Sequence, residues 1–130
     1  MAAGDVASAM STEVLSVGPG HTLRQVAAIM ASAKVGSAVV HDTDGSGVGI
    51  ITERDILRSV AANQDLDAET AGDHQTSEVV FASPSWSLLE AADAMKRGGF
   101  RHLVVLDNGE VAGIISVRDI VKVWATDHTH

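Results

Sequence analysis

Hydrophobic and polar positions follow two periods along this chain, and the same order of periods occurs twice. Short β-branched stretches over residues 14–17 and 79–81 have the composition of strands. Each stretch leads into a turn that contains a proline and then into a stripe of apolar residues at helical spacing. The two stripes comprise Leu23, Val26, Ala27 and Met30, and Leu88, Ala91, Ala92 and Met95. The pattern therefore predicts strand, turn and helix in two places.

Residue types mark where these two helices begin and end. Each starts with a capping box, in which a hydroxyl and a longer polar side chain satisfy backbone N–H groups of the first turn. The boxes are Thr22-x-x-Gln25 and Ser87-x-x-Glu90. Gly36 and the pair Gly98-Gly99 follow the stripes, and glycine most readily adopts the left-handed conformation that ends a helix. We therefore expect both helices to stop there.

Each helix is followed by two apolar strands, joined by a turn rich in Asp, Gly and Asn, and then by a closing helix. We expect the strands at residues 37–40 and 48–51 in the first copy and at 102–106 and 111–115 in the second. The order of elements is therefore βαββα, which places the chain in the mixed α/β (α+β) class.

The two units are copies of one another in sequence. Residues 13–40 align without gaps on residues 78–105 at an offset of 65, and residues 48–60 align on residues 112–124 at an offset of 64. Neither copy alone has enough apolar surface for a core, so we expect the tandem repeats to pack as a pseudo-two-fold pair. We assign residues 6–60 to the first repeat, 61–70 to a polar, acidic linker, 71–124 to the second repeat and 125–130 to a C-terminal tail.

Composition narrows the class of protein. A chain of 130 residues with 45% hydrophobic residues is long enough for a compact domain. No apolar run approaches the roughly 20 residues that cross a bilayer, and residues 1–10 lack the features of a signal peptide, so we expect a soluble, cytoplasmic protein. The lack of cysteine excludes disulfides, thiol catalysis and cysteine-based metal sites. A net charge of −8 disfavours nucleic acid, so an anionic ligand needs a local group of basic residues.

A block of the form Thr/Ser-x-x-Asp follows the last strand of each copy. One interpretation is structural: the hydroxyl caps the closing helix, and the aspartate offsets the positive end of its dipole. The other interpretation adds a ligand, because the helix start and an arginine attract phosphate while the aspartate accepts hydrogen bonds from ribose hydroxyls. The two interpretations are compatible. The blocks are Thr52-Glu53-Arg54-Asp55 and Ser116-Val117-Arg118-Asp119.

The βαββα repeat, with a Gly-Ile-Ile-Thr/Ser-x-Arg-Asp-Ile block at its third strand and second helix, resembles the cystathionine-β-synthase (CBS) repeat. Two copies of the block stand at matched positions, and the resemblance covers nearly the whole chain. It implies a free-standing pair of repeats with clefts between their sheets. Some members of the family bind AMP, ADP, ATP, S-adenosylmethionine or similar ligands there, and others bind nothing known. We therefore expect a regulatory module that senses such an adenosyl ligand and is not an enzyme; the alternative is a ligand-free module for protein interaction.

The resemblance also assigns roles to residues, and basic residues rank the two sites. Arg101-His102 begins the second strand of copy two, where CBS domains that bind nucleotides often place basic residues against phosphates; copy one has Ser37-Ala38 there instead. The better-equipped site comprises Arg101, His102, Ser116, Arg118 and Asp119, and the second comprises Thr52, Arg54 and Asp55. The resemblance adds Val14 and Val80 beside an adenine ring, and Ser11 and Thr76 from the segments before each first strand. By residue type alone, short apolar strand positions such as Val14 and Val80 belong to a core.

Other chemistry is not indicated by these patterns. The histidines lack the spacing of metal ligands, and only His128 and His130 are locally paired, in the tail. No triad order, glycine-rich phosphate loop or carboxylate pair indicates turnover. The resemblance implies a homodimer formed through helical faces, and a target protein on a separate chain. Dimerisation would cover Ile56, Leu57, Val60, Ile120, Val121 and Trp124.

Overall fold

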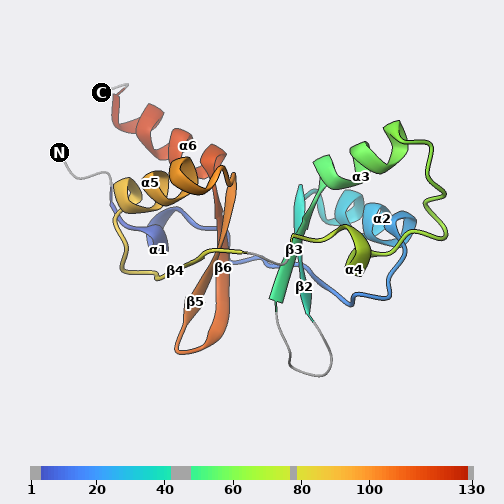
Figure 1. Cartoon of the computed structure of the whole chain (residues 1–130). Coiled ribbons are helices and arrows are strands. Elements are labelled where there is room, and N and C mark those ends of the chain that lie inside the picture. The colour runs from blue at the N-terminus through green and yellow to red at the C-terminus, as the bar shows by residue number, and fades with distance from the viewer. Residues whose placement is uncertain (1–3, 42–47, 77–78, 129–130) are drawn as a thin grey trace. The chain divides into compact units, whose positions relative to one another are not determined.

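The computed structural model describes residues 4–41, 48–76 and 79–128, with the side chains of residues 127 and 128 excepted. The described residues form two three-stranded sheets with their helices, which confirms the expected mixed α/β class (Figure 1). The chain divides into two compact units. We call residues 15–79 the first-repeat unit, and residues 1–14 together with 80–130 the second-repeat unit.

The first-repeat unit is built around a sheet of order β1-β2-β3. Its elements are β1 (Ser16–Val17), α2 (Leu23–Ala33), β2 (Ser37–His41), β3 (Val48–Thr52), α3 (Glu53–Ala61) and α4 (Ala71–His74). Strand β1 runs parallel to β2, and β2 runs antiparallel to β3. Ser37 is paired with Thr52, so the start of β2 and the end of β3 lie together where α3 begins.

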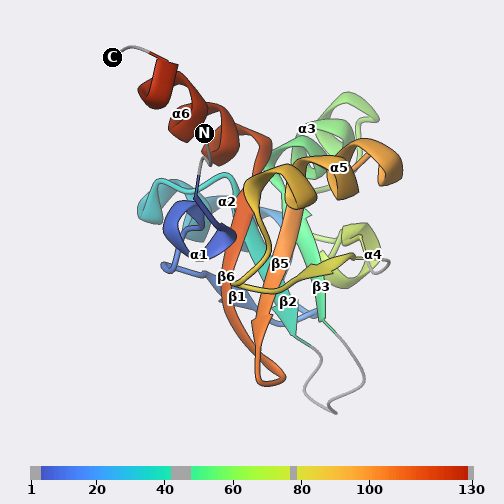
Figure 2. The same ribbon diagram turned by 90° about the vertical axis from the view of Figure 1, so that its left-hand side faces the viewer.

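The second-repeat unit has the same topology, with a sheet of order β4-β5-β6. Its elements are α1 (Val6–Ala9), β4 (Phe81–Ala82), α5 (Leu88–Gly98), β5 (His102–Asp107), β6 (Glu110–Ser116) and α6 (Val117–His128). His102 is paired with Ser116, which brings the start of β5 to the start of α6. Helix α1 belongs to this unit, and Figure 2 shows it in blue on the side of the ribbon that faces the viewer.

The two predicted capping boxes are both present. Thr22 Oγ1 accepts a hydrogen bond from the Gln25 N–H at 3.1 Å, and Gln25 Oε1 accepts one from the Thr22 N–H at 2.9 Å. Ser87 and Glu90 make the same reciprocal pair at the start of α5, at 3.0 and 3.1 Å. The starts of α2 and α5 are thus fixed by local sequence.

The ends of these helices follow the expected positions less closely. Gly99 ends α5 in the left-handed conformation, with φ of 71°. The prediction of a stop at Gly36 is wrong, because α2 ends at Lys34, whose φ is 58°. The N–H of Val35 then bonds to the Met30 carbonyl at 3.0 Å, and its half-buried side chain packs on the core of the unit. Burial of Val35 accompanies the left-handed conformation of Lys34.

Each unit has a core of its own. The predicted stripe of α2 is buried at Leu23, Val26 and Met30, and the stripe of α5 at Leu88, Ala91 and Met95; Ala27 and Ala92 lie half-buried at the edges. Strand residues complete the cores. Val17, Ala38, Val40 and Ile51 pack with α2, and Ala82, Leu103, Val105 and Ile115 pack with α5.

Each sheet gains a further bridge from the segment that precedes the other repeat in the chain. Ser11 exchanges two backbone hydrogen bonds with Ile114 of β6, at 2.8 and 3.0 Å, and Thr76 does so with Ile50 of β3 at the same distances. Residues 6–14, placed in the first repeat by sequence, therefore lie in the second-repeat unit, and residues 71–76 lie in the first-repeat unit. We call 4–14 and 71–76 the crossing segments.

Two glycines allow the crossing segments to approach. A Cβ on Gly113 would lie 2.6 Å from the carbonyl oxygen of Ser11, and one on Gly49 would lie 3.0 Å from the carbonyl oxygen of Thr76. The contact at Gly113 would displace backbone, and the contact at Gly49 is tight enough to need a small shift. The glycine of each Gly-Ile-Ile block is thus needed for the close approach of a neighbouring chain segment.

Candidate functional site

The end of β6 and the start of α6 carry a compact polar cluster. The Ser116 N–H donates to Asp119 Oδ2 at 2.8 Å, and the Ser116 hydroxyl donates to the same oxygen at 3.0 Å. The Asp119 N–H donates back to Ser116 Oγ at 3.1 Å. Both residues are half-buried. The structural interpretation of the block, a cap on the closing helix, therefore holds in this copy.

The first copy repeats this cluster between β3 and α3. The Thr52 N–H and hydroxyl donate to Asp55 Oδ2 at 2.8 and 3.1 Å, and the Asp55 N–H donates to Thr52 Oγ1 at 3.4 Å. Among the described residues, Oδ1 of Asp55 and Oδ1 of Asp119 have no hydrogen-bond partner. Each cap therefore uses one carboxylate oxygen and leaves the other able to accept a hydrogen bond from a ligand.

The residue just before the second strand of each repeat is tied to the same helix start. The Val117 N–H donates to the Arg101 carbonyl oxygen at 3.0 Å, and the Glu53 N–H donates to the Gly36 carbonyl oxygen at 3.0 Å. Arg101 therefore corresponds to Gly36. We call Gly36, Ser37 and residues 52–55 the first junction, and Arg101, His102 and residues 116–119 the second junction.

This correspondence corrects, by one residue, the predicted counterpart of Arg101-His102 in the first copy. The expected counterpart of Arg101-His102 is Ser37-Ala38, whereas the strand registers pair Ser37 with Thr52 and His102 with Ser116. The counterpart of Arg101-His102 is therefore Gly36-Ser37. The first copy still lacks a basic residue at this place, and at the position of Arg101 it lacks a side chain altogether.

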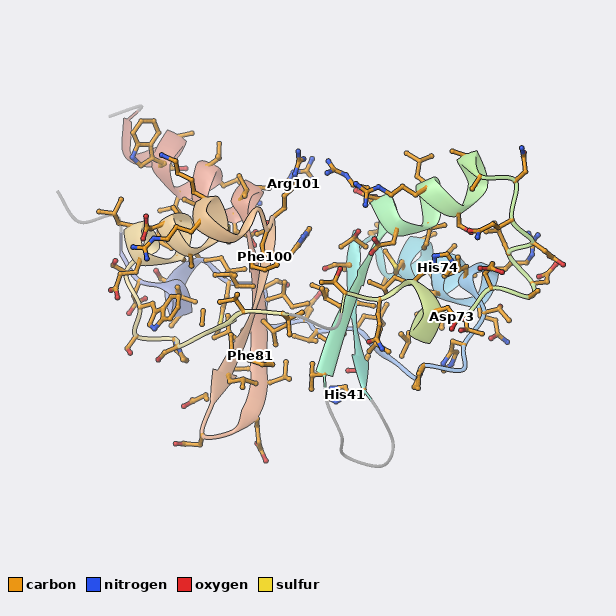
Figure 3. The ribbon with its side chains drawn as sticks, viewed as in Figure 1. His41, Asp73, His74, Phe81, Phe100 and Arg101 are labelled. Atoms are coloured by element: carbon orange, nitrogen blue, oxygen red, sulfur yellow. The ribbon has the colours of Figure 1, made fainter. Side chains whose placement is uncertain are left out.

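Charge differs between the two junctions. The second junction carries the exposed cations Arg101 and Arg118 and one carboxylate, Asp119; Figure 3 shows the Arg101 side chain extending away from the sheet. The first junction carries one exposed cation, Arg54, and two carboxylates, Glu53 and Asp55. Only the second junction has an excess of positive charge, which is what a phosphate group requires.

Glu53 is a residue that the sequence analysis did not single out. Its carboxylate lies over Gly36, because a Cβ on that glycine would be 3.2 Å from Glu53 Oε1. The available signal was the alignment of the two blocks, which sets Glu53 against Val117. An acidic residue facing an apolar one within otherwise matched blocks marks a chemical difference between them.

The remaining predicted site residues divide between the units. Ser11 and Thr76 are exposed and pair with Ile114 and Ile50, each two residues before the hydroxyl residue of its junction. Ser11 thus belongs to the unit of the second junction and Thr76 to that of the first. Val14 is half-buried in the second-repeat unit, and Val80, also half-buried, packs on the core of that unit.

Histidines serve local structure where their contacts are seen. His21 Nδ1 accepts a hydrogen bond from the Gly18 N–H at 3.0 Å, and His74 Nε2 lies 2.7 Å from Glu69 Oε1. Within the described part of the chain, no three His, Cys, Asp or Glu side chains are grouped to hold a metal ion. The His128 side chain and His130 lie outside the described residues.

No helix among residues 4–41, 48–76 and 79–128 combines the length and apolar character of a bilayer span.

The sequence model of the CBS domain matches residues 3–62 and residues 71–126. The chain belongs to the CBS domain family. The match covers both copies of the Thr/Ser-x-x-Asp block and so confirms the resemblance on which the pair of repeats was predicted.

Relatives of this CBS pair include proteins longer than this chain. An uncharacterized 17.7 kDa protein of Acidianus ambivalens is 36% identical over 125 residues, which are 95% of this chain and 75% of that protein. The chain spans a smaller share, 35%, of a Methanocaldococcus jannaschii protein to which it is 35% identical over 98 residues.

Two solved structures resemble the CBS pair over nearly their full length. A CBS-domain containing protein from Agrobacterium tumefaciens has a TM-score of 0.83 and 33% identity, with 95% of each chain covered. A CBS domain protein from Pyrobaculum aerophilum, solved in complex with AMP, has a TM-score of 0.79 and 32% identity, covering 94% of this chain and 98% of that one.

Proposed function

We propose that this CBS pair is a regulatory module that senses an adenine nucleotide or a related adenosyl compound, and that the second junction is its principal binding site. The observation that carries the proposal is the composition of this junction. A Ser–Asp pair with an available carboxylate oxygen stands beside two exposed arginines at the start of a helix. The same place supplies acceptors for a ribose and cations for a phosphate.

Each group of the ligand has a matching set of residues. Asp119 Oδ1 accepts a ribose hydroxyl, while Oδ2 stays in the cap with Ser116. Arg101 and Arg118 bind the phosphate together with the positive end of α6, and His102 lies beside them at the start of β5. Val80, Val14 and Ser11 line the adenine. Thr52, Arg54, Asp55 and Thr76 form the corresponding, second-ranked site at the first junction.

The AMP complex of the Pyrobaculum aerophilum relative supports the choice of ligand, because the two chains are 32% identical over nearly their full lengths. A nucleotide bound at a capped helix start biases the conformations that the module presents to a target. The module acts on a separate target protein and performs no chemistry on its ligand.

Calorimetric titration with AMP, ADP, ATP and S-adenosylmethionine tests the proposal. We expect saturable binding of at least one of them, lost in Asp119→Asn, which keeps an oxygen for the helix cap but replaces the available oxygen with an amide. Asp107→Ala is the matched control, because Asp107 is at the opposite end of β5 from His102. No heat from any of the four ligands, with folded protein, would favour the alternative of a ligand-free interaction module.

We further propose that the CBS pair forms homodimers through its closing helices. Helix α3 exposes Leu57 and Val60, with 66% and 49% of their surfaces accessible, and α6 exposes Val121 and Trp124, with 56% and 58% accessible. Ile56 and Ile120 are half-buried beneath them. Large apolar residues that gather on one helix are typical of a surface covered by another protein.

A further inference from the structure

The two junctions share their hydroxyl–aspartate cap but differ in side-chain chemistry at three positions: Ser37 in the first corresponds to His102 in the second, and one further pair differs in charge. Gly36 and Glu53 in the first junction correspond to Arg101 and Val117 in the second, because each pair is joined by the same 3.0 Å backbone hydrogen bond. The swap exchanges a cation and an apolar residue for a glycine and a carboxylate. The pair Gly36 and Glu53 thus gives the first junction a net negative contribution, and the pair Arg101 and Val117 gives the second a positive one.

The carboxylate of Glu53 lies where the stem of an arginine would begin. A Cβ on Gly36 would be 3.2 Å from Oε1 and 3.3 Å from Cδ of Glu53. Glu53 is also the first residue of α3, so its negative charge lies at the helix end where backbone N–H groups would otherwise attract an anion. The acidic side chain already meets that positive end.

A phosphate at the first junction would meet two carboxylates, Glu53 and Asp55, and one arginine. At the second junction it would meet two arginines and one carboxylate. Like charges repel, and they repel more strongly near a protein surface than in bulk water. The hydroxyl and aspartate that recognise ribose are equivalent in the two junctions, so only phosphate recognition differs.

We infer that Glu53, together with the missing side chain at Gly36, is a specificity determinant that excludes phosphate from the first junction. The consequence is that one chain binds one phosphorylated adenine nucleotide, at the second junction. The first junction takes only adenosyl compounds that carry no phosphate. This inference rests on the proposed function, since it assumes that the hydroxyl–aspartate pairs recognise ribose.

The inference can be tested by exchanging residues between the two junctions. The variant Gly36→Arg/Glu53→Val gives the first junction the arginine and the valine of the second and leaves Ser37, the counterpart of His102, unchanged. Gly36 is not in the left-handed region of φ, so a side chain there is compatible with the backbone, and removal of Glu53 takes away the nearest atoms. Gly36→Gln/Glu53→Val is the matched control, with similar bulk and no cation.

The readout is the number of AMP molecules bound per chain in calorimetry. We expect one in the wild type, two in Gly36→Arg/Glu53→Val and one in the glutamine control. Adding Asp55→Asn to the arginine variant should return the number to one. Circular dichroism confirms that each variant is folded.

Different outcomes overturn different statements. Two AMP molecules bound by the wild type, or one still bound by the folded arginine variant, would overturn the role of Glu53 and leave the proposed function intact. No AMP bound by the wild type would overturn AMP binding at the second junction. In that case, a site gained in the arginine variant would uphold the role of Glu53, and no gain would overturn it as well.

Discussion

The backbone N–H of Val117 donates to the carbonyl oxygen of Arg101 at 3.0 Å, which joins the first residue of α6 to the residue just before β5. This bond holds the Cα of Arg101 at the helix start, while its side chain remains exposed. The cation is thus anchored at its backbone and free to reach a ligand. Several measurable consequences follow from such local pairings.

Removal of the Arg101 cation should weaken AMP binding. A hydrogen bond to a charged group contributes roughly 1.5–3 kcal/mol, and solvent screening of an exposed group reduces this, so we expect Arg101→Ala to raise Kd about tenfold. Arg97→Ala is the control, since Arg97 is an exposed arginine that pairs with Asp93 on α5. Equal affinity in Arg101→Ala and the wild type would remove Arg101 from the site.

Salt should discriminate between a nucleotide and its nucleoside. Raising ionic strength from about 0.01 M to about 0.1 M shortens the Debye length from about 30 Å to about 10 Å, which screens the attraction between arginine and phosphate. We expect the Kd of AMP to rise over this range and the Kd of adenosine to stay nearly constant. Parallel changes for the two ligands in fluorescence or calorimetric titrations would contradict a phosphate contact with Arg101 and Arg118.

Loss of a helix cap should lower stability without any ligand. Ser87→Ala removes the acceptor of the Glu90 N–H at the start of α5, and a lost N-cap costs about 1 kcal/mol. Ser32→Ala, at an exposed position within α2, should have the opposite sign because alanine favours the helix interior. Urea unfolding of both variants measures the difference, and an unchanged midpoint for Ser87→Ala would contradict the capping role.

A side chain at Gly113 should detach the N-terminal crossing segment. The added Cβ of Gly113→Ala would meet the Ser11 carbonyl oxygen at 2.6 Å, and overpacking of this kind costs about 1–3 kcal/mol. We expect faster amide exchange at Ser11 and a lower unfolding midpoint. Gly20→Ala is the control, because its Cβ would meet nothing within 4 Å. Unchanged exchange at Ser11 would show that the segment tolerates the displacement.

Charge on the exposed apolar residues should oppose self-association. Leu57→Glu and Val121→Glu each place a carboxylate on a surface that the proposed homodimer buries, so we expect a dimer mass for the wild type and a monomer mass for the double variant. Leu89→Glu changes an 81% exposed leucine on α5 and should leave the mass unchanged. Light scattering at micromolar concentration measures the mass of each variant, and a monomer mass for the wild type would contradict the homodimer.

The sequence predicted those features that depend on short-range pairing. Capping boxes at Thr22 and Ser87 act over three residues, and the apolar stripes of α2 and α5 have a simple period, so both could be read directly. The repeated block likewise located the two hydroxyl–aspartate clusters, because hydroxyl and aspartate stand three residues apart at a strand–helix boundary.

Features that depend on distant contacts were not predictable in the same way. Lys34 adopts a left-handed conformation that its residue type does not favour, next to Val35, which packs on the core of the unit. The pairing of Ser11 with Ile114 joins positions about a hundred residues apart, so no local pattern encodes it. The offset of 65 already sets Gly36 against Arg101, so the counterpart of Arg101 was predictable although it was misplaced by one residue. The approach of the Glu53 carboxylate to Gly36 depends on the packing of α3 against β2 and was not predictable.

The crossing segments affect the order in which the two units can fold during translation. The chain is synthesised from its N-terminus, and the first-repeat unit is the continuous range 15–79. This unit can therefore fold while the rest of the chain is still being synthesised. Residues 4–14 emerge earlier still, yet β6, with which Ser11 pairs, is synthesised only after the whole first-repeat unit. Val6 and Met10, whose apolar side chains pack on the core of the second-repeat unit, therefore remain exposed on the nascent chain until the second repeat has been synthesised.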